Sequence, residues 1–215
     1  LNVTYELGDE LNSVIEGYLF SKKDYAQKGS TNGSKIDHVK VVGIRGSTNI
    51  LDGLNIQAEY AHQSGTRGTG STAATRSRNA HILQFISNYS VPLMEEYDPV
   101  LTYVYTKATG DKTARTTDDD YTAWHQLYEN QGGRTIYNSI FNLTNMQVHS
   151  LALSAVPMED VTAKLTVSKL MLMEPVDANT NITWMVAPDG DTLTLTGQNT
   201  KHKGLGIEVD AEFGY

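Results

Sequence analysis

The sequence contains no cysteine, and this absence removes several kinds of chemistry. A chain without thiols has no disulfide bonds, no thiolate metal ligands and no cysteine nucleophile. Long apolar runs are also missing: the longest, at 170–173, is far shorter than the roughly 18 residues that a membrane-spanning helix needs. The alternating pattern begins at Leu1 without a signal peptide, so we expect a mature form or an interior part of a longer chain.

Basic residues are outnumbered, 17 against 25 acidic ones, which gives a net charge of -8. A negative balance argues against nonspecific nucleic-acid binding. Phenylalanine and tryptophan are scarce, with 4 and 2 residues, whereas there are 12 tyrosines. Tyrosine suits positions that are partly exposed to water, because it joins an apolar ring to a polar hydroxyl. The apolar share of 39 % is low for a soluble core, but a barrel with a polar lumen needs no more.

The strongest positive signal is the alternation of apolar and polar residues at every second position. In the last segment, 205–215, one face is apolar and the other carries Glu208, Asp210 and Glu212. Burying three carboxylates without partners in a protein core would be very costly. A strand with one face in lipid and the other in a water-filled lumen avoids that cost.

Similar alternation runs through much of the chain. It predicts strands near 1–7, 11–22, 37–49, 54–64, 79–90, 99–109, 146–156, 161–173 and 204–215. Two places break the pattern. The doublet Val41-Val42 predicts a bulge. Lys169 falls on an apolar face, so its side chain either reaches the rim of the membrane or follows a slip in the alternation.

Short and long connections alternate along the chain. Turns near 8–10, 51–53 and 157–160 are tight, 91–98 is intermediate, and long loops are expected near 24–35, 65–78, 110–135 and 174–203. An up-and-down barrel shows this rhythm when one rim faces the periplasm and the other the exterior. Within the long loops we expect a short helix over the pore at 121–128, an extra strand or inward fold at 136–145, and a hairpin formed by 183–186 and 192–196.

These patterns predict an all-β fold, an antiparallel up-and-down transmembrane β-barrel with about nine to ten strands in this sequence. Residues 1–215 would form a single barrel domain or a barrel fragment. Bacterial barrels usually have an even number of strands, so an odd count and a start inside a strand favour a larger barrel. The terminal aromatic Tyr215, as in barrel assembly signals, favours a complete chain instead.

The alternation also assigns side chains to the two faces. The expected lipid-facing residues are Leu54, Ile56, Leu165, Val167, Leu205, Ile207, Val209 and Phe213. The expected pore-lining residues, which would set selectivity, are Glu6, Arg45, Glu59, Lys164, Glu208, Asp210 and Glu212. Carboxylates outnumber cations in this second set, so the lumen is expected to favour cations or neutral solutes.

Other candidate sites are weaker. Asp118, Asp119 and Asp120 lack the spacing of a calcium loop, which favours a solvated acidic loop. The histidines show no ligand spacing, and adjacent His149 and Ser150 point to opposite faces of their strand. No GxSxG motif is present, so neither a metal site nor a catalytic site is expected.

The aromatic and basic residues outside these sets have alternative roles. Several tyrosines on apolar faces or near strand ends fit an aromatic girdle, while others must face the lumen or a core. Arg67, Arg76 and Arg78 lie in a stretch rich in glycine, threonine and serine. They suit contact with lipopolysaccharide phosphates or an anionic solute, although a mobile, solvated loop is favoured.

The stretch 121–166, YTAWHQLYENQGGRTIYNSIFNLTNMQVHSLALSAVPMEDVTAKLT, resembles the alginate-export family of outer-membrane barrels. In that family a loop with an aromatic motif leads to an Asn-Leu stretch, a strand, a proline-containing turn and another strand. The closing LGIEVDAEFGY also resembles a strand of that family, so the resemblance covers about the last hundred residues. It implies a monomeric barrel of about eighteen strands that conducts a polymer or small solutes. Exporters of a polyanion are expected to line the pore with arginines, and the acidic lumen departs from that pattern.

The first functional hypothesis is a channel in the bacterial outer membrane that passes small solutes or a polysaccharide by passive diffusion. Such a channel is not an enzyme and needs no cofactor or metal. Its expected partners are outer-membrane lipids, including lipopolysaccharide, and the solute itself, with no nucleic acid. Two alternatives remain: a barrel that forms a sheath around an electron-transfer partner, and a soluble all-β carbohydrate-binding module.

Overall fold

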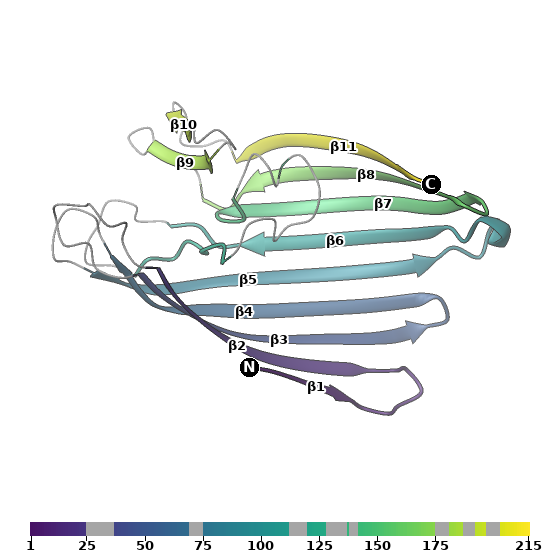
Figure 1. The fold of residues 1–215 in the computed structure, drawn as a ribbon, viewed down its shortest axis with the longest axis horizontal. Helices are drawn as coiled ribbons and strands as arrows, with labels where there is room; N and C mark the ends of the chain where they lie inside the picture. The colour runs from purple at the N-terminus through teal and green to yellow at the C-terminus, as the bar shows by residue number, and fades with distance from the viewer. Residues whose placement is uncertain are drawn as a thin grey trace.

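The structure, a computed structural model, describes residues 1–24, 37–68, 75–111, 120–127, 137, 142–174, 181–186, 192–196 and 203–215. Nine strands form one antiparallel sheet in which every strand except β11 follows its neighbour in the chain (Figure 1). They are β1 (Asn2–Glu6), β2 (Val14–Asp24), β3 (Asp37–Leu51), β4 (Leu54–Gly68), β5 (Thr75–Ser90), β6 (Val100–Ala108), β7 (Met146–Met158), β8 (Val161–Leu172) and β11 (Gly204–Gly214). This arrangement confirms the predicted all-β, up-and-down fold.

Two smaller elements complete the described structure. β9 (Asn181–Val186) and β10 (Thr192–Thr196) pair as a separate antiparallel ribbon, which is the hairpin that the sequence predicts. A short 3-10 helix, η1 (Glu95–Tyr97), lies in the connection between β5 and β6. Within the described ranges no helix is long and apolar enough to cross a membrane.

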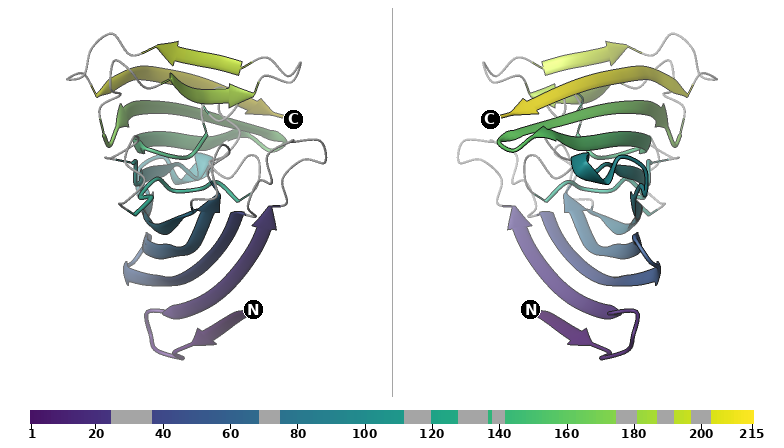
Figure 2. Two further views of the ribbon diagram at one scale, coloured as in Figure 1. Left: turned by 90° about the vertical axis from the view of Figure 1, so that its left-hand side faces the viewer. Right: turned by 90° about the vertical axis from the view of Figure 1, so that its right-hand side faces the viewer.

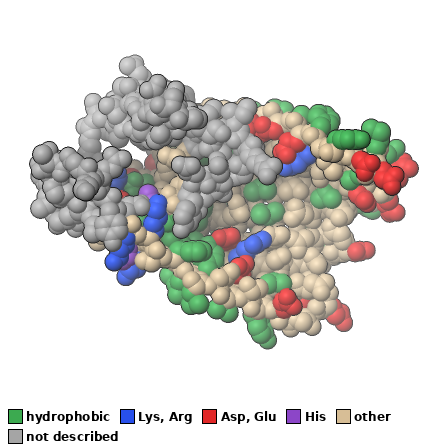
Figure 3. Space-filling view, in the orientation of Figure 1, with side chains coloured by type: hydrophobic (Ala, Val, Ile, Leu, Met, Phe, Trp, Pro, Cys, Tyr) green, Lys and Arg blue, Asp and Glu red, His purple; other side chains and the backbone are tan. Residues whose placement is uncertain are grey.

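The short connections join the strands at one end and the long ones at the other (Figure 1). Gly8 and Gly53 take positive φ angles of 68° and 73° in two of the tight turns, a conformation that costs glycine little. All charged residues in the four short connections are acidic: Asp9, Glu10, Asp52, Glu95, Glu96, Asp98, Glu159 and Asp160. Acidic side chains accordingly gather at this end of the molecule (Figure 3).

The sheet is strongly curved and follows the wall of an open trough (Figure 2). The strand register sends alternate residues to the concave and convex faces. The convex face carries large apolar side chains that no other part of the described structure covers. They include Ile15, Leu19, Val42, Ile44, Leu83, Leu151, Leu153, Leu165, Val167, Ile207 and Val209. A continuous apolar surface of this kind marks contact with a membrane or another protein.

The buried apolar residues lie on the concave face, near the end with the long loops. One cluster consists of Val39, Val41, Ala61, Ala80, Ala108, Trp124, Leu127 and Leu143. A second consists of Tyr137, Met146, Val148 and Leu170, with Leu205 packed against it. Both clusters combine wall residues with residues from the connection between β6 and β7, which folds back into the trough.

The doublet Val41-Val42 has a different explanation from the predicted bulge. Register runs unbroken through both residues, and the nearest irregularity in β3 lies between Asn49 and Leu51. Val42 faces outward and is 54 % exposed, while Val41 is buried on the concave face beneath the inward-folded connection. Both faces are therefore apolar at this height, which removes the contrast on which the alternation depends.

Two loop predictions also need correction. The segment 121–127 is irregular rather than helical, and Tyr121 forms a bridge with Arg78 of β5. β4 and β5 continue to Gly68 and from Thr75, so the loop expected at 65–78 is much shorter. Most of the predicted loops 24–35, 110–135 and 174–203 lies outside the described residues, as do Tyr128 and half of the stretch 136–145.

Candidate pore lining and the segment folded over it

All seven predicted pore-lining residues lie on the concave face. Glu6 lies on the concave face of β1, opposite Val14. Arg45 pairs in register with Glu16 and Glu59, and Lys164 pairs with Glu212. Asp210 and Glu208 face Thr166 and Ser168 across the β8–β11 ladder. Residues opposite each other in antiparallel strands share a face, so these side chains form two polar groups on one wall. Their role in selectivity remains a prediction.

The first polar group spans β2, β3 and β4. Arg45 Nη2 donates to Gln57 Oε1 at 2.5 Å, and Arg45 Nη1 lies 3.9 Å from Glu16 Oε2. The Tyr18 hydroxyl donates to Glu59 Oε1. The Arg45 side chain is 43 % exposed, so its ion pair with Glu16 adds little stability. The group instead provides a hydrated polar surface that carries both negative and positive charge.

Gly43 makes this arrangement possible. It lies directly opposite Tyr18, and a Cβ added to it would approach the Tyr18 ring to within 2.1 Å. The ring therefore lies across the bare backbone of Gly43. This position directs the hydroxyl of Tyr18 to Glu59, two strands away.

The second polar group spans β7, β8 and β11. Lys164 Nζ donates to Glu212 Oε1 at 3.4 Å, and Ser150 and Ser168 hydroxyls are 2.8 Å apart. Thr166 Oγ1 and Asp210 Oδ2 are buried, and neither has a hydrogen-bond partner among the described atoms. Thr166 and Asp210 face each other in register, so these two oxygens remain able to accept hydrogen bonds on the lumen side of the wall.

The segment 120–127, here called the inner segment, lies against the concave wall. Gln63 on β4 is fully buried and binds the backbone of His125 twice. Its amide Nε2 donates to the His125 carbonyl at 2.7 Å, and its Oε1 accepts the His125 N–H at 2.8 Å. Lys22 Nζ donates to the Leu127 carbonyl at 3.0 Å, and the Trp124 N–H donates to the Thr109 carbonyl at 2.9 Å. The wall thus satisfies backbone groups that would otherwise be buried without partners.

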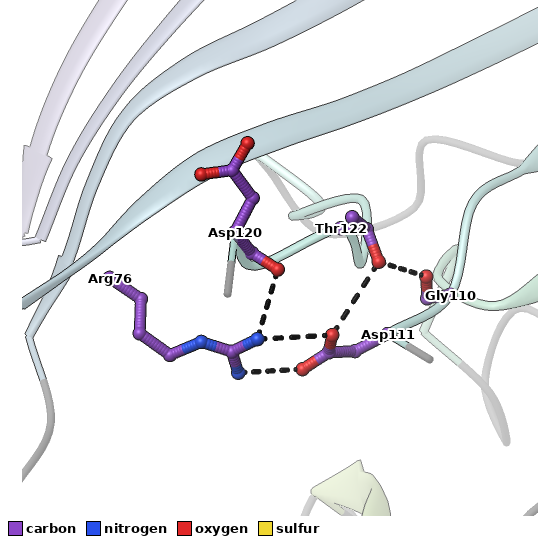
Figure 4. Close-up of polar contacts among 5 residues, drawn as sticks. All are labelled: Arg76, Gly110, Asp111, Asp120 and Thr122. Carbon is purple, nitrogen blue, oxygen red and sulfur yellow. Dashed lines mark hydrogen bonds and ion pairs between the residues drawn. The ribbon is translucent and has the colours of Figure 1, made fainter. Parts of the chain in front are cut away.

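The start of the inner segment is held by Arg76 of β5 (Figure 4). Arg76 donates to both carboxylate oxygens of Asp111, at 2.8 and 3.3 Å, and to the Asp120 carbonyl at 2.9 Å. Thr122 Oγ1 donates to the Gly110 carbonyl at 2.7 Å. Bidentate, charge-assisted pairs of this kind fix geometry better than a single bond. Arg76 is only 6 % exposed, so this contact is a structural clamp.

The three arginines that the sequence placed in a mobile loop are part of the wall. Arg67 lies on β4, and Arg76 and Arg78 lie on β5. Their guanidinium carbons are 3.9, 5.4 and 5.1 Å from the centre of the Tyr121 ring. Arg78 also lies 3.5 Å from Asp37 Oδ2. The favoured loop interpretation was therefore wrong, since the arginines bind the inner segment and neighbouring carboxylates.

A recess of about 400 Å³ lies between the wall and the inner segment. Its lining combines charged, amide and aromatic side chains, including Glu16, Tyr18, Arg45, Glu59, Gln84 and Trp124. A few polar groups beside aromatic surface are typical of sites that bind small polar solutes. No group of three or more potential metal-binding side chains occurs in the described part of the chain, and Asp118 and Asp119 lie outside it.

Seven of the eight expected lipid-facing residues lie on the convex face. These are Leu54, Ile56, Leu165, Val167, Ile207, Val209 and Phe213. Leu205 is the exception, because the register shifts between Gly204 and Gly206. This irregularity turns Leu205 toward the second apolar cluster of the concave face. Contact of the other seven with lipid remains a prediction.

A single curved, all-β, up-and-down wall with one polar and one apolar face defines an outer-membrane β-barrel transport protein. Residues 11–211 match the family described as alginate export, and the chain belongs to that family. The match confirms the resemblance seen in the last hundred residues and extends it through the first half, where the sequence showed only generic barrel features. Among curated proteins, none matches the chain.

Proposed function

We propose that the protein is a channel of the bacterial outer membrane that passes small neutral or cationic solutes, saccharides among them, by passive diffusion. The observation that carries this proposal is the segregation of charge between the two faces of the wall. Within the nine strands of the main sheet, no Asp or Glu occupies a convex position, whereas Glu16, Glu59, Asp210 and Glu212 are concave. An apolar exterior and a charged interior are what lipid outside and water inside require.

The lengths of the connections at the two ends of the sheet support an orientation. Short turns face the periplasm and long loops the exterior in barrels of this kind. The end with β1–β2 and β3–β4 turns would then be periplasmic, and the inner segment would lie near the external mouth. A constriction there selects solutes before they reach the rest of the lumen.

The lumen chemistry supports solutes other than a polyanion. Of the three clustered arginines, Arg76 and Arg78 pair with Asp111 and Asp37, and Arg67 lies over the Tyr121 ring. The described wall otherwise carries more carboxylates than cations. A negative lumen lowers the free energy of a cation and raises that of an anionic polymer.

The inner segment also argues against the sheath hypothesis. It packs on the wall through Trp124 and Leu127, so it occupies space that a threaded partner protein would need. A soluble binding module would in turn have to expose the apolar convex face to water, at roughly 25 cal/mol for each Å².

Planar-bilayer recording tests the proposal. The refolded protein should give discrete open steps with a preference for cations. A triple variant, Glu59→Gln, Asp210→Asn and Glu212→Gln, should lose most of that preference with little change in conductance. The matched control, Glu95→Gln with Glu96→Gln and Asp98→Asn, removes three charges from one short connection and should change selectivity less. Anion preference in the unmodified protein, or an absence of open steps, would refute the proposal.

A further inference from the structure

The convex face carries positive charge only toward its long-loop end. Four lysines lie there: Lys23 on β2, Lys40 on β3, Lys107 on β6 and Lys169 on β8. We call them the lysine belt. Their register partners on neighbouring strands, such as Ser21 and Ser64 for Lys40, belong to the convex face as well.

The belt lysines differ from the cations of the concave face in having no partner among the described residues. Lys22 binds the Leu127 carbonyl, Arg76 binds Asp111, and Lys164 binds Glu212. No belt lysine makes an ion pair or side-chain hydrogen bond with any described residue. No strand carboxylate shares their face, so no carboxylate of the described strands neutralises them.

The belt lysines are offset from one another along the strands, and this offset places them at one level of a barrel. Residues paired across neighbouring strands form a ladder row, and each lysine can be followed along its row to another belt strand. The ladder row of Lys23 meets β3 at His38, two residues before Lys40. The row of Lys107 passes through Leu83 and Tyr60 and meets β3 at Ile44, four residues after Lys40. The row of Lys169 passes through His149 and meets β6 at Tyr105, two residues from Lys107. Each step goes toward the short turns.

The total stagger matches the tilt of a membrane barrel. The three steps add to eight residues over the six strand intervals from β2 to β8. Eight residues span about 26 Å along a strand, and six intervals span about 29 Å across the sheet. The belt therefore crosses the ladder rows at about 42°, within the tilt of about 35–45° that transmembrane strands show. Lysines scattered at random on the face would not form such a level line.

Aromatic side chains mark the same level. The Tyr60 hydroxyl lies 2.6 Å from His81 Nδ1, and the Tyr103 hydroxyl lies 2.8 Å from His149 Nδ1. All four side chains are convex and lie within a few residues of the belt. Amphipathic rings gather where the hydrocarbon of a membrane meets its headgroups. The belt is thus at headgroup height, where long lysine side chains can extend from the apolar wall into the polar layer.

We propose that the lysine belt binds the phosphate groups of outer-leaflet lipids, namely the phosphorylated sugar headgroups of lipopolysaccharide. The inference rests on the proposed membrane location and adds the partner of the outer wall. Phosphate is the anion that a lipid headgroup presents at this height, and ammonium groups bind it as point charges. The belt takes the role that the sequence had suggested for Arg67, Arg76 and Arg78, whose charges are used inside the molecule.

Binding of a defined lipid tests the proposal. The full chain, folded in detergent micelles, is titrated with lipid A that carries two phosphates and with the same lipid after removal of both. Replacing all four belt lysines by glutamine should weaken binding of the phosphorylated lipid by up to several hundredfold, given about fivefold for each charge. The unphosphorylated lipid should bind equally weakly to both proteins, and inorganic phosphate at the same concentration should not compete.

Two controls separate charge from folding. The corresponding four-arginine variant keeps the charges and should keep the affinity, while Lys164→Gln removes a concave lysine and should leave it unchanged. If the glutamine variant does not fold, Lys107→Gln and Lys169→Gln singly should each still weaken binding several-fold. Affinity within twofold of the original in the folded glutamine variant would overturn the proposal. A parent protein that is monomeric in plain buffer, without heat-modifiable migration, would instead refute the membrane location.

Discussion

Gly43 shows how one missing side chain fixes the position of another. The Tyr18 ring occupies the space where a Cβ at residue 43 would lie. We predict that Gly43→Ala displaces the ring, breaks the hydrogen bond from Tyr18 to Glu59, and destabilises the barrel by about 1–3 kcal/mol. Gly17→Ala is the matched control, since a Cβ on Gly17 meets no atom within 4 Å. Unfolding in urea measures both, and equal effects would contradict the prediction.

Asp9 gives a residue-scale prediction about pH. The Ser13 N–H donates to Asp9 Oδ1 at 2.7 Å, and this hydrogen bond lowers the pKa of the Asp9 carboxyl below its ordinary value of 3.8. A lowered pKa in the folded state means that the ionised form stabilises the turn above pH 3.8. This contribution disappears as the pH falls through the lowered pKa.

The measurement is a carboxyl NMR titration of Asp9. We expect its midpoint below 3.8, and we expect Asp9→Asn to show a smaller loss of stability between pH 5 and pH 2 than the unmodified protein. A midpoint at or above 3.8 would show that the turn does not hold the ionised carboxylate.

Among the elements, the inner segment depends most on a single wall residue. Gln63 satisfies both backbone groups of His125, and a side chain without an amide satisfies neither. We predict that Gln63→Met destabilises the folded protein by about 2 kcal/mol and raises single-channel conductance, because the segment loses its hold on β4. Gln84→Met should have a smaller effect, since the hydrogen bond of Gln84 within the described residues goes to Thr106 on the neighbouring strand. Equal conductance in the two variants would argue that the segment does not narrow the pore.

The strands were predictable because each has water on one side and an apolar surface on the other. That contrast leaves a period of two in the sequence, as in 204–214, and it assigns the faces wherever it holds. It fails where protein covers the concave face, as at Val41-Val42, and where the backbone bulges, as at Leu205. It also misses the strand ends at Arg67 and Arg76, because their polar side chains alternate with small polar ones.

The inner segment could not be predicted for a different reason. Its position depends on long-range contacts such as Gln63 with His125, which are 62 residues apart and leave no periodic trace. The sequence predicts a helix at 121–128, but the wall supplies backbone hydrogen bonds that a helix would have supplied internally. Nothing in the sequence marked Gln63 for burial, because its burial depends on the segment that covers it.

At the scale of the whole molecule, the apolar convex face separates a membrane protein from a water-soluble one. Val209 is convex and 62 % exposed. We predict that Val209→Lys lowers the stability of the protein folded in bilayers by about 2–4 kcal/mol, because the ammonium group would enter hydrocarbon. Glu212→Lys also introduces a lysine on β11, but on the concave face. It replaces the ion pair with Lys164 by two facing lysines, and it should still cost only about 1 kcal/mol because both side chains are about half exposed. Reversible unfolding from lipid vesicles measures both, and a neutral effect of Val209→Lys would place that surface in water.

The inner segment belongs to the connection between β6 and β7, yet these two strands pair along nine positions without it. The inner segment is therefore an insert carried by a wall whose strands pair without it. Such a design separates the solute range, which the connection sets, from the scaffold, which the strands set, so selection can change each independently. A graft that lengthens or shortens one connection would retune the solute range while the scaffold, its lipid contacts and its assembly stay the same.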